Sequence, residues 1–187
     1  MTEWTQRAHV LADHAVSGVL GHVSSLHFDT MSELLWVGSA SGQLTSHTGA
    51  LPTLPRYTSL AAHGVPKQPR HVRGILSDDK FIISLSEGRV CASQRQGLGR
   101  WSMQIEDHAP GVALAGLCAS PQSASSDIIV GGAAPNSHDA LFALHSTSGR
   151  IVRRAVSDGT VTQLRKGNRY LCVGTEEGTI QLHDPRS

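Results

Sequence analysis

Long apolar runs are missing from this sequence, and none approaches the ~18 residues that a membrane-spanning helix needs. An excess of charge is missing too, because 16 Lys and Arg stand against 15 Asp and Glu, for a net charge of +1. This balance gives no reason to expect a nucleic acid or a membrane surface as partner. The N-terminus also lacks the basic start and apolar run of a signal peptide. We therefore expect a soluble, intracellular protein with no membrane contact.

Cysteines and aromatic residues are scarce as well. The three cysteines, Cys91, Cys118 and Cys172, are odd in number and far apart, and each lies in an apolar stretch. This pattern argues against a disulfide framework and favours buried free thiols in a reducing compartment. Aromatic residues make up 4% of the chain, whereas it has 19 glycines. Frequent glycine between short apolar runs favours many short strands joined by turns.

What the sequence does contain is a repeat. LLWVGSASGQLTSHTG (34–49) and YLCVGTEEGTIQLHD (170–184) share an apolar run, Val-Gly, a hydroxyl residue and a second glycine. Gly38 and Gly174 are 174 − 38 = 136 positions apart, which is three steps of about 45 residues, the length of a four-stranded propeller blade. Intermediate copies lie at Gly88 and at Val130-Gly131, the latter with a polar insertion at 133–139. The repeat predicts an all-β fold.

The repeats divide the chain into four units after a leader at residues 1–17. Each unit has an upstream strand: VSSLHFD (23–29), HVRGIL (71–76), ALAGLCAS (113–120) and TVTQLRK (160–166). We expect a partial β-propeller of about three and a half to four blades out of seven, the fourth cut short after its third strand. The predicted blades span residues 18–63, 64–108, 109–156 and 157–187. On this reading the chain is a fragment, a truncated gene product or the start of a longer protein. Because of its exposed blade faces and the edge at Gln181-Leu182, we expect the isolated chain to aggregate, self-associate or fold poorly.

The amino-acid sequence of the repeats resembles that of a known family. Gly21-His22 stands ahead of the first strand, and His183-Asp184 occupies the place of a Trp-Asp pair. Four phrases follow in order: ELLWVGSASGQLTSHTG, RYTSLAAH, VRGILSDDKFIISLSEGRV and GNRYLCVGTEEGTIQLHDPRS. Over residues 18–187 the chain resembles the N-terminal WD40 propeller of the catalytic subunit of the poly(A)-nuclease deadenylation complex, fungal type. It departs from the family at SEGRVCASQRQGLGRW and has no true Trp-Asp.

The resemblance implies a role in a larger subunit. A family member of full length is a poly(A)-specific 3'-5' exoribonuclease, with a linker for a pseudokinase partner subunit and a C-terminal nuclease domain that uses two Mg²⁺ ions. None of that machinery lies in these 187 residues. The resemblance therefore implies a non-catalytic scaffold for mRNA poly(A)-tail shortening, in the cytoplasm and P-bodies, that positions the pseudokinase subunit and the poly(A) ribonucleoprotein. Direct contact with RNA is left open.

Searches for chemistry in the residues themselves give no site. GSASG (38–42) has Ala40 where a nucleophile elbow needs serine, and a strand follows it, so we interpret it as a hairpin turn held by its glycines. The histidine pairs, His9 with His14 and His22 with His27, lack further ligands at metal spacing. We expect His22 to be structural and His183 to replace a Trp.

The acidic residues sit mostly at turns, and Asp78-Asp79 and Glu176-Glu177 are predicted hairpin tips. The segment with Lys67, Arg70, His71 and Arg73 could contact RNA phosphates or form a solvated connection between blades; it has no aromatic residue among its cations. We therefore expect no catalytic, cofactor-binding or metal residues, and Trp36 and Trp101 to pack between blades. The open alternatives are a WD40-like scaffold of an unrelated complex, a truncated non-functional product, and an enzyme in its own right.

Overall fold

The chain forms four antiparallel sheets. A computed structural model describes residues 22–29, 31–48, 56–60, 63, 70–96, 98–120, 127–135 and 139–184; the predicted leader and Lys67 lie outside them. The described residues contain fifteen strands and one short 3-10 helix, η1 (Ile105–Asp107). The prediction of an all-β fold is confirmed.

The strands run in chain order within each sheet. The first two sheets contain β1 (Val23–Phe28), β2 (Leu34–Ser39), β3 (Leu44–Thr48) and β4 (Arg56–Leu60), then β5 (Gly74–Ser77), β6 (Phe81–Leu85), β7 (Arg89–Gln94) and β8 (Gly99–Gln104). The last two contain β9 (Ala113–Ala119), β10 (Asp127–Ala133), β11 (Asp139–His145) and β12 (Ile151–Val156), then β13 (Val161–Lys166), β14 (Leu171–Thr175) and β15 (Ile180–His183). We call these sheets blades 1 to 4.

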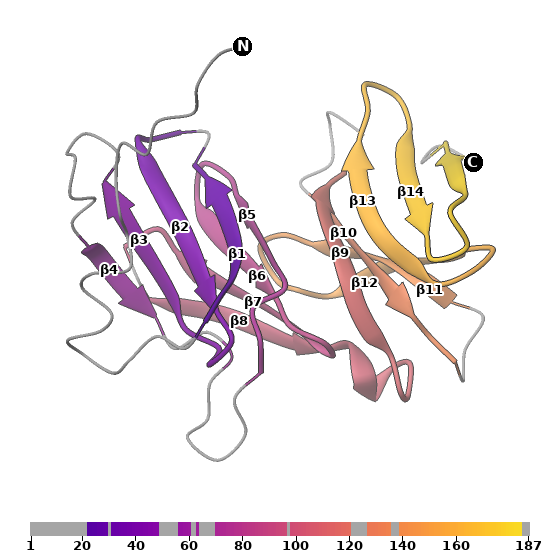
Figure 1. Cartoon of the computed structure of the whole chain (residues 1–187), viewed down its shortest axis with the longest axis horizontal. Helices are drawn as coiled ribbons and strands as arrows, with labels where there is room; N and C mark the ends of the chain where they lie inside the picture. Colours follow the sequence, from indigo (N-terminus) through magenta and orange to yellow (C-terminus); the bar gives the residue numbers. More distant parts are fainter. Residues whose placement is uncertain are drawn as a thin grey trace, which may run out of the picture.

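The blades are arranged radially. The first strands of successive blades contact one another, β1 with β5, β5 with β9 and β9 with β13. Blade 1 runs from β1 near the middle of the molecule to β4 at its left edge, and blade 4 from β13 to β15 at its right (Figure 1). This is the arrangement of propeller blades around an axis.

Apolar side chains join each pair of neighbouring blades. Blades 2 and 3 share the largest cluster, in which Ile83, Leu85 and Val90 meet Leu114 and Phe142. Smaller clusters lie between the other pairs, around Trp36 and Ile82 for blades 1 and 2 and around Leu141 and Val173 for blades 3 and 4. One blade buries its faces only against its neighbours, so the fold depends on stacking.

One predicted strand begins later than the sequence suggests. HVRGIL was expected to be extended from residue 71, but β5 begins at Gly74. The residues before it bond to other strands: the Val72 amide donates to the Ser39 carbonyl of blade 1, and the Arg73 amide to the Leu85 carbonyl. The segment therefore ties blade 1 to blade 2.

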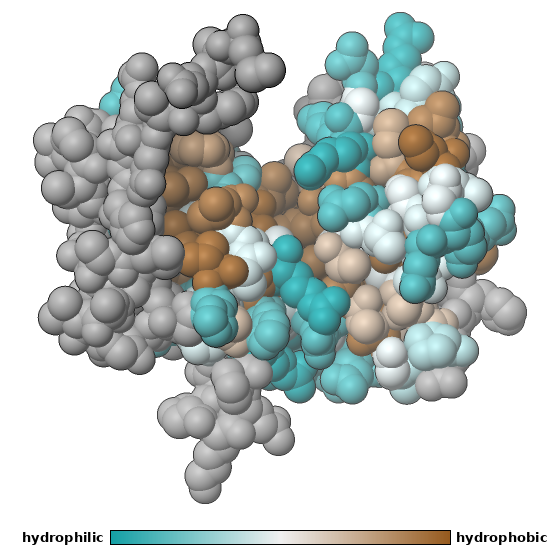
Figure 2. Space-filling view, viewed as in Figure 1, coloured by the Kyte–Doolittle hydropathy of each residue, from teal (hydrophilic) through white to brown (hydrophobic). Residues whose placement is uncertain are grey.

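The two outer blades expose apolar residues. In blade 1, Leu26 and Phe28 of β1 are 61% and 77% exposed, and in blade 4, Ile180 and Leu182 of β15 are 78% and 66% exposed. Apolar surface is visible in the hollow between the two halves of the molecule and on the last blade (Figure 2). The predicted edge at Gln181-Leu182 is present, because β15 pairs only with β14 among the described strands.

Candidate interaction surface

The part of the chain that the structure describes holds no group of three or more His, Cys, Asp or Glu side chains placed to bind a metal ion. It also contains no helix long and apolar enough to cross a membrane. Cys91 and Cys118 are buried thiols, as predicted, whereas Cys172 is only half-buried. Burial raises the pKa of both thiols, that of Cys118 to about 12, so neither is a reactive thiolate at neutral pH.

The GSASG loop is a hairpin turn, but its two glycines have different roles. Gly42 has φ +84° and needs the freedom of glycine. Gly38 lies inside β2 and is buried, and a Cβ there would come within 2.6 Å of Val72 Cγ1. The prediction that both glycines form the turn is therefore wrong for Gly38, which permits close packing of blade 1 against the segment before blade 2.

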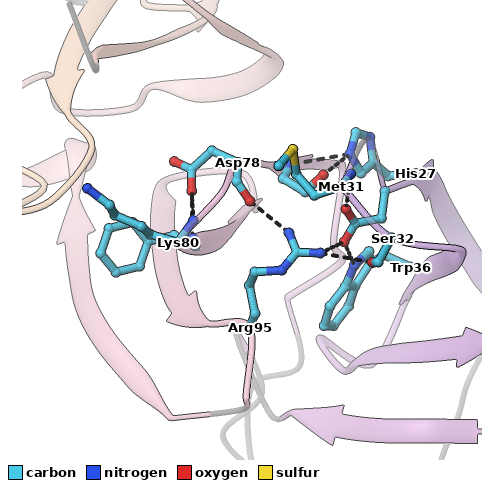
Figure 3. A network of polar contacts seen from close by, with 10 residues as sticks. His27, Met31, Ser32, Trp36, Asp78, Lys80 and Arg95 are labelled. Atoms are coloured by element: carbon cyan, nitrogen blue, oxygen red, sulfur yellow. Dashed lines mark hydrogen bonds and ion pairs between the residues drawn. The ribbon is translucent and has the colours of Figure 1, made fainter.

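A polar network joins blades 1 and 2 (Figure 3). Arg95, just after β7, donates to the Asp29 carboxylate, to Ser32 Oγ at 2.9 Å and to the Asp78 carbonyl at 2.7 Å. Asp29 also accepts from Trp36 Nε1 at 3.0 Å and from the Met31 amide at 2.8 Å. Desolvation opposes the charge of Asp29, but these hydrogen bonds outweigh it and lower the pKa of the carboxyl. The Asp29 carboxylate thus links blade 1 to blade 2.

The predicted packing roles of the two tryptophans are confirmed. Trp36 is fully buried and packs with Leu44 of its own blade and Ile82 of blade 2. Trp101 packs against the cluster between blades 2 and 3 and donates from Nε1 to the Ser146 carbonyl at 2.7 Å. Both rings therefore join neighbouring blades.

The structure contains a buried structural histidine that sequence reasoning missed. His63 is buried; its Nε2 lies 2.9 Å from Ser84 Oγ, and its Nδ1 lies 3.7 Å from Cys91 Sγ. His22, assigned that role from the sequence, is exposed at the surface. Its position before the second blade could have indicated a structural role for His63. Its partners could not be predicted, because they are 21 and 28 residues further along the chain. His183, expected to replace a Trp, is half-buried, with Nε2 3.2 Å from Gln181 Oε1.

The basic segment singled out in the sequence is neutralised where the structure describes it. Arg70 lies 4.0 Å from the Glu106 carboxylate, and Arg73 pairs with Glu87. Asp78, at the next turn, accepts from the amides of Lys80 and Phe81 at 2.7 and 2.6 Å, as predicted for a hairpin tip. These pairings favour the structural interpretation of the segment over RNA binding.

A pocket of about 360 Å³ lies between the outer parts of blades 3 and 4. Its floor is apolar and includes Ile129, Leu141 and Leu171, and Arg153 and Arg154 of β12 also line it. Asp127, Asp184, Ser120 and His183 complete its polar lining. A hollow lined by apolar side chains with a few polar groups is suited to holding part of another molecule.

Next to the pocket, the turn between β13 and β14 carries RKGNRY (165–170), which we call the basic turn. Arg165, Lys166, Arg169 and Tyr170 are all exposed, and Leu171, the following residue, lines the pocket. This turn was not predicted as a surface site, because its residues entered the sequence argument only as part of a segment that resembles the family. It is the described surface segment that places three cations beside an exposed aromatic ring.

Comparison with known proteins relates the chain to one family. The model of the family described as PAN2 N-terminal matches residues 8–187. The PAN2-PAN3 deadenylation complex catalytic subunit pan2 of Aspergillus oryzae is 36% identical over 158 residues, which are 84% of this chain and 12% of that protein. The corresponding subunit of Schizosaccharomyces pombe is 31% identical over 166 residues, 88% of this chain and 14% of the relative. The chain thus spans only about an eighth of the length of these relatives.

Solved structures give the same result for the fold. The WD40 domain of Neurospora crassa Pan2 matches with a TM-score of 0.73 and 27% identity, over 88% of this chain and 47% of that one. The WD40 propeller of Doa1 matches with a TM-score of 0.67 at 14% identity, over 89% of this chain and 52% of that one, which supports the fold alone. The predicted WD40-like propeller is confirmed.

Proposed function

The chain belongs to the PAN2 N-terminal family, and from this membership we propose that it is a non-catalytic interaction scaffold of a poly(A)-tail-shortening complex. The match of the family model over residues 8–187 carries the proposal. In the proposal the chain positions a PAN3-type pseudokinase subunit and the poly(A) ribonucleoprotein for the nuclease of the same subunit. It acts in the cytoplasm, including P-bodies.

The use of polar residues supports a scaffold. Asp29 and Asp78 bond to backbone amides and to groups that hold turns and blades together, and Glu87 and Glu106 pair with arginines. A two-metal nuclease needs several carboxylates that converge on one point. Carboxylates spread over turns serve a rigid framework, on which surface loops recognise partners. Poly(A) shortening is accordingly assigned to other domains, which would supply the Mg²⁺ site.

A chimera tests the proposal. The aligned segment of Schizosaccharomyces pombe pan2 is replaced by this chain in cells lacking their own pan2, and poly(A) tail lengths and co-precipitation of PAN3 are measured. We expect tail shortening and PAN3 capture to be restored. A chimera that is expressed but captures no PAN3 and leaves tails long would favour a WD40 scaffold of an unrelated complex. Degradation of poly(A) RNA by the purified chain with Mg²⁺ would contradict a non-catalytic role.

A further inference from the structure

The basic turn is held in a fixed conformation. The Gly167 amide donates to the Tyr170 carbonyl at 2.8 Å, and Lys166 pairs with Leu171 across the hairpin. Leu171 is buried in the cluster between blades 3 and 4 and anchors the turn to the core. Figure 1 shows this turn projecting where β13 passes into β14, and the surface there is hydrophilic (Figure 2). Little ordering is needed when a ligand binds such a preformed turn.

The charge of the turn is not neutralised within the described residues. Arg165, Lys166 and Arg169 form no ion pair there. In blades 1 and 2, by contrast, Arg70, Arg73 and Arg95 each pair with a carboxylate. Of the acidic residues of blade 4, Asp158 and Glu176-Glu177 lie at the opposite end of its strands, whereas Asp184, which follows β15, lies at the same end as the turn. Although the whole chain carries a net charge of only +1, three cations against this one carboxylate make that end of blade 4 locally positive.

An exposed aromatic ring accompanies these cations. Tyr170 follows Arg169 directly and is 45% exposed. An acidic peptide would need the cations alone, whereas single-stranded nucleic acid combines phosphates with bases that stack on aromatic faces. Arg153 and Arg154 line the adjoining pocket together with Asp127 and Asp184, so the charges of that pocket are balanced and the turn itself supplies the excess of positive charge.

We propose that the basic turn binds single-stranded RNA, with phosphates at Arg165, Lys166 and Arg169 and a base stacked on Tyr170. The choice of RNA over DNA rests on the proposed function. The surface is distinct from the segment around Arg70 and Arg73, whose cations are paired.

Fluorescence anisotropy of a labelled 15-nucleotide oligo(A) with the purified chain, at several salt concentrations, tests this. We expect Lys166→Gln with Arg169→Gln to weaken binding about tenfold or more and to make the slope of log affinity against log salt less negative by about 1.4, since each single-strand phosphate contact contributes about 0.7. Lys80→Gln with Arg100→Gln removes the same charge from exposed residues of blade 2 and should leave affinity within twofold. Circular dichroism checks that each variant is folded.

Tyr170 separates stacking from charge. Tyr170→Phe should retain affinity, whereas Tyr170→Ser should lose about fivefold without a change in salt slope. Equal losses in both double variants, an unchanged affinity for Tyr170→Ser, or competition by poly-glutamate as strong as by oligo(A) would overturn the proposal. Absence of RNA binding by the chain, together with tail shortening by the chimera, would refute this surface and leave the proposed function standing.

Discussion

At the scale of single residues, His63 shows how a neutral polar group is used inside the molecule. Its ring is only 2% exposed and is held between Ser84 on β6 and Cys91 on β7. Burial disfavours the charged imidazolium and lowers the pKa of His63 to about 4 from an ordinary value of 6.5. The hydrogen bond to Ser84 therefore joins two neutral partners at physiological pH.

This shift predicts acid sensitivity. Between pH 6.5 and 4 the unfolded chain binds a proton at His63 that the folded chain does not, so the free energy of unfolding falls as the pH falls through that window. From pH 7 to pH 5 the loss from this group is about 2 kcal/mol. Urea unfolding at a series of pH values measures this loss. The slope of the unfolding free energy against pH should correspond to about one bound proton fewer in His63→Gln than in the wild-type chain.

The remaining pH dependence has named sources. His27 contributes in the same direction, because burial lowers its pKa despite Asp29 nearby. Asp29 does not contribute between pH 7 and pH 5. Because its pKa is lowered in the folded chain, the stability that it supplies is lost only below about pH 3.8. A slope identical in the wild-type chain and in His63→Gln would refute the assignment, as would an NMR titration of the folded His63 ring near pH 6.5.

At the scale of elements, the turn after β1 and the end of β7 depend on each other. Asp29 and Arg95 are 66 residues apart, and the Asp29 side chain is fully buried while that of Arg95 is 22% exposed. Removing one partner of a buried ion pair leaves an uncompensated charge. We predict that Arg95→Met lowers the free energy of unfolding by about 2–3 kcal/mol, as measured by urea denaturation.

A double-mutant cycle identifies the cause of that loss. Asp29→Asn removes the charge that Arg95→Met would strand, so the double variant should be more stable than the sum of the single losses implies, by about 1 kcal/mol or more. Strictly additive losses would mean that Arg95 acts through packing of its aliphatic stem. Arg100→Met, an exposed substitution on β8, serves as the control and should stay within about 0.5 kcal/mol.

The strands were largely predictable because they depend on local pattern. Val37-Gly38 and Val173-Gly174 mark the second strand of a blade wherever alternation and turn residues coincide, and β2 and β14 lie there. Packing roles were not predictable from the same pattern. A Cβ on Gly38 would strike Val72, whereas one on Gly174 would meet Gln163 Cβ at an ordinary 3.7 Å. The difference depends on which element covers each face, and one sequence does not encode that locally.

The candidate surface was less predictable for the same reason. The segment around Arg70 and Arg73 looked the more basic, but its partners Glu106 and Glu87 are 36 and 14 residues away. The number of cations in a sequence segment therefore did not predict how many of them are unpaired at the surface. The basic turn at 165–170 looked ordinary beside it, but its three cations exceed the carboxylates near it, because Asp158, Glu176 and Glu177 of blade 4 lie at the other end of the strands.

At the scale of the whole molecule, the same stacking that stabilises the inner blades leaves the outer ones incomplete. Blades 2 and 3 share the largest core, whereas β1 and β15 expose Leu26, Phe28, Ile180 and Leu182 on surfaces that other blades would cover in a closed ring. β15 also has an unpaired edge among the described strands, without a proline, bulge or lysine to discourage pairing.

We therefore predict that the isolated 187-residue chain self-associates through these surfaces. Burying one large aliphatic side chain gains about 1.5–3 kcal/mol, so Ile180 and Leu182 from two copies gain about 6–12 kcal/mol before the cost of association, and the free strand edge adds hydrogen bonds. Sedimentation velocity over a concentration series measures it, and Ile180→Lys with Leu182→Lys should shift the chain toward monomer. Val152→Lys with Val156→Lys, two exposed positions on β12, should leave the association unchanged. A concentration-independent monomer with sharp cooperative unfolding in the wild-type chain would show instead that four blades are self-sufficient.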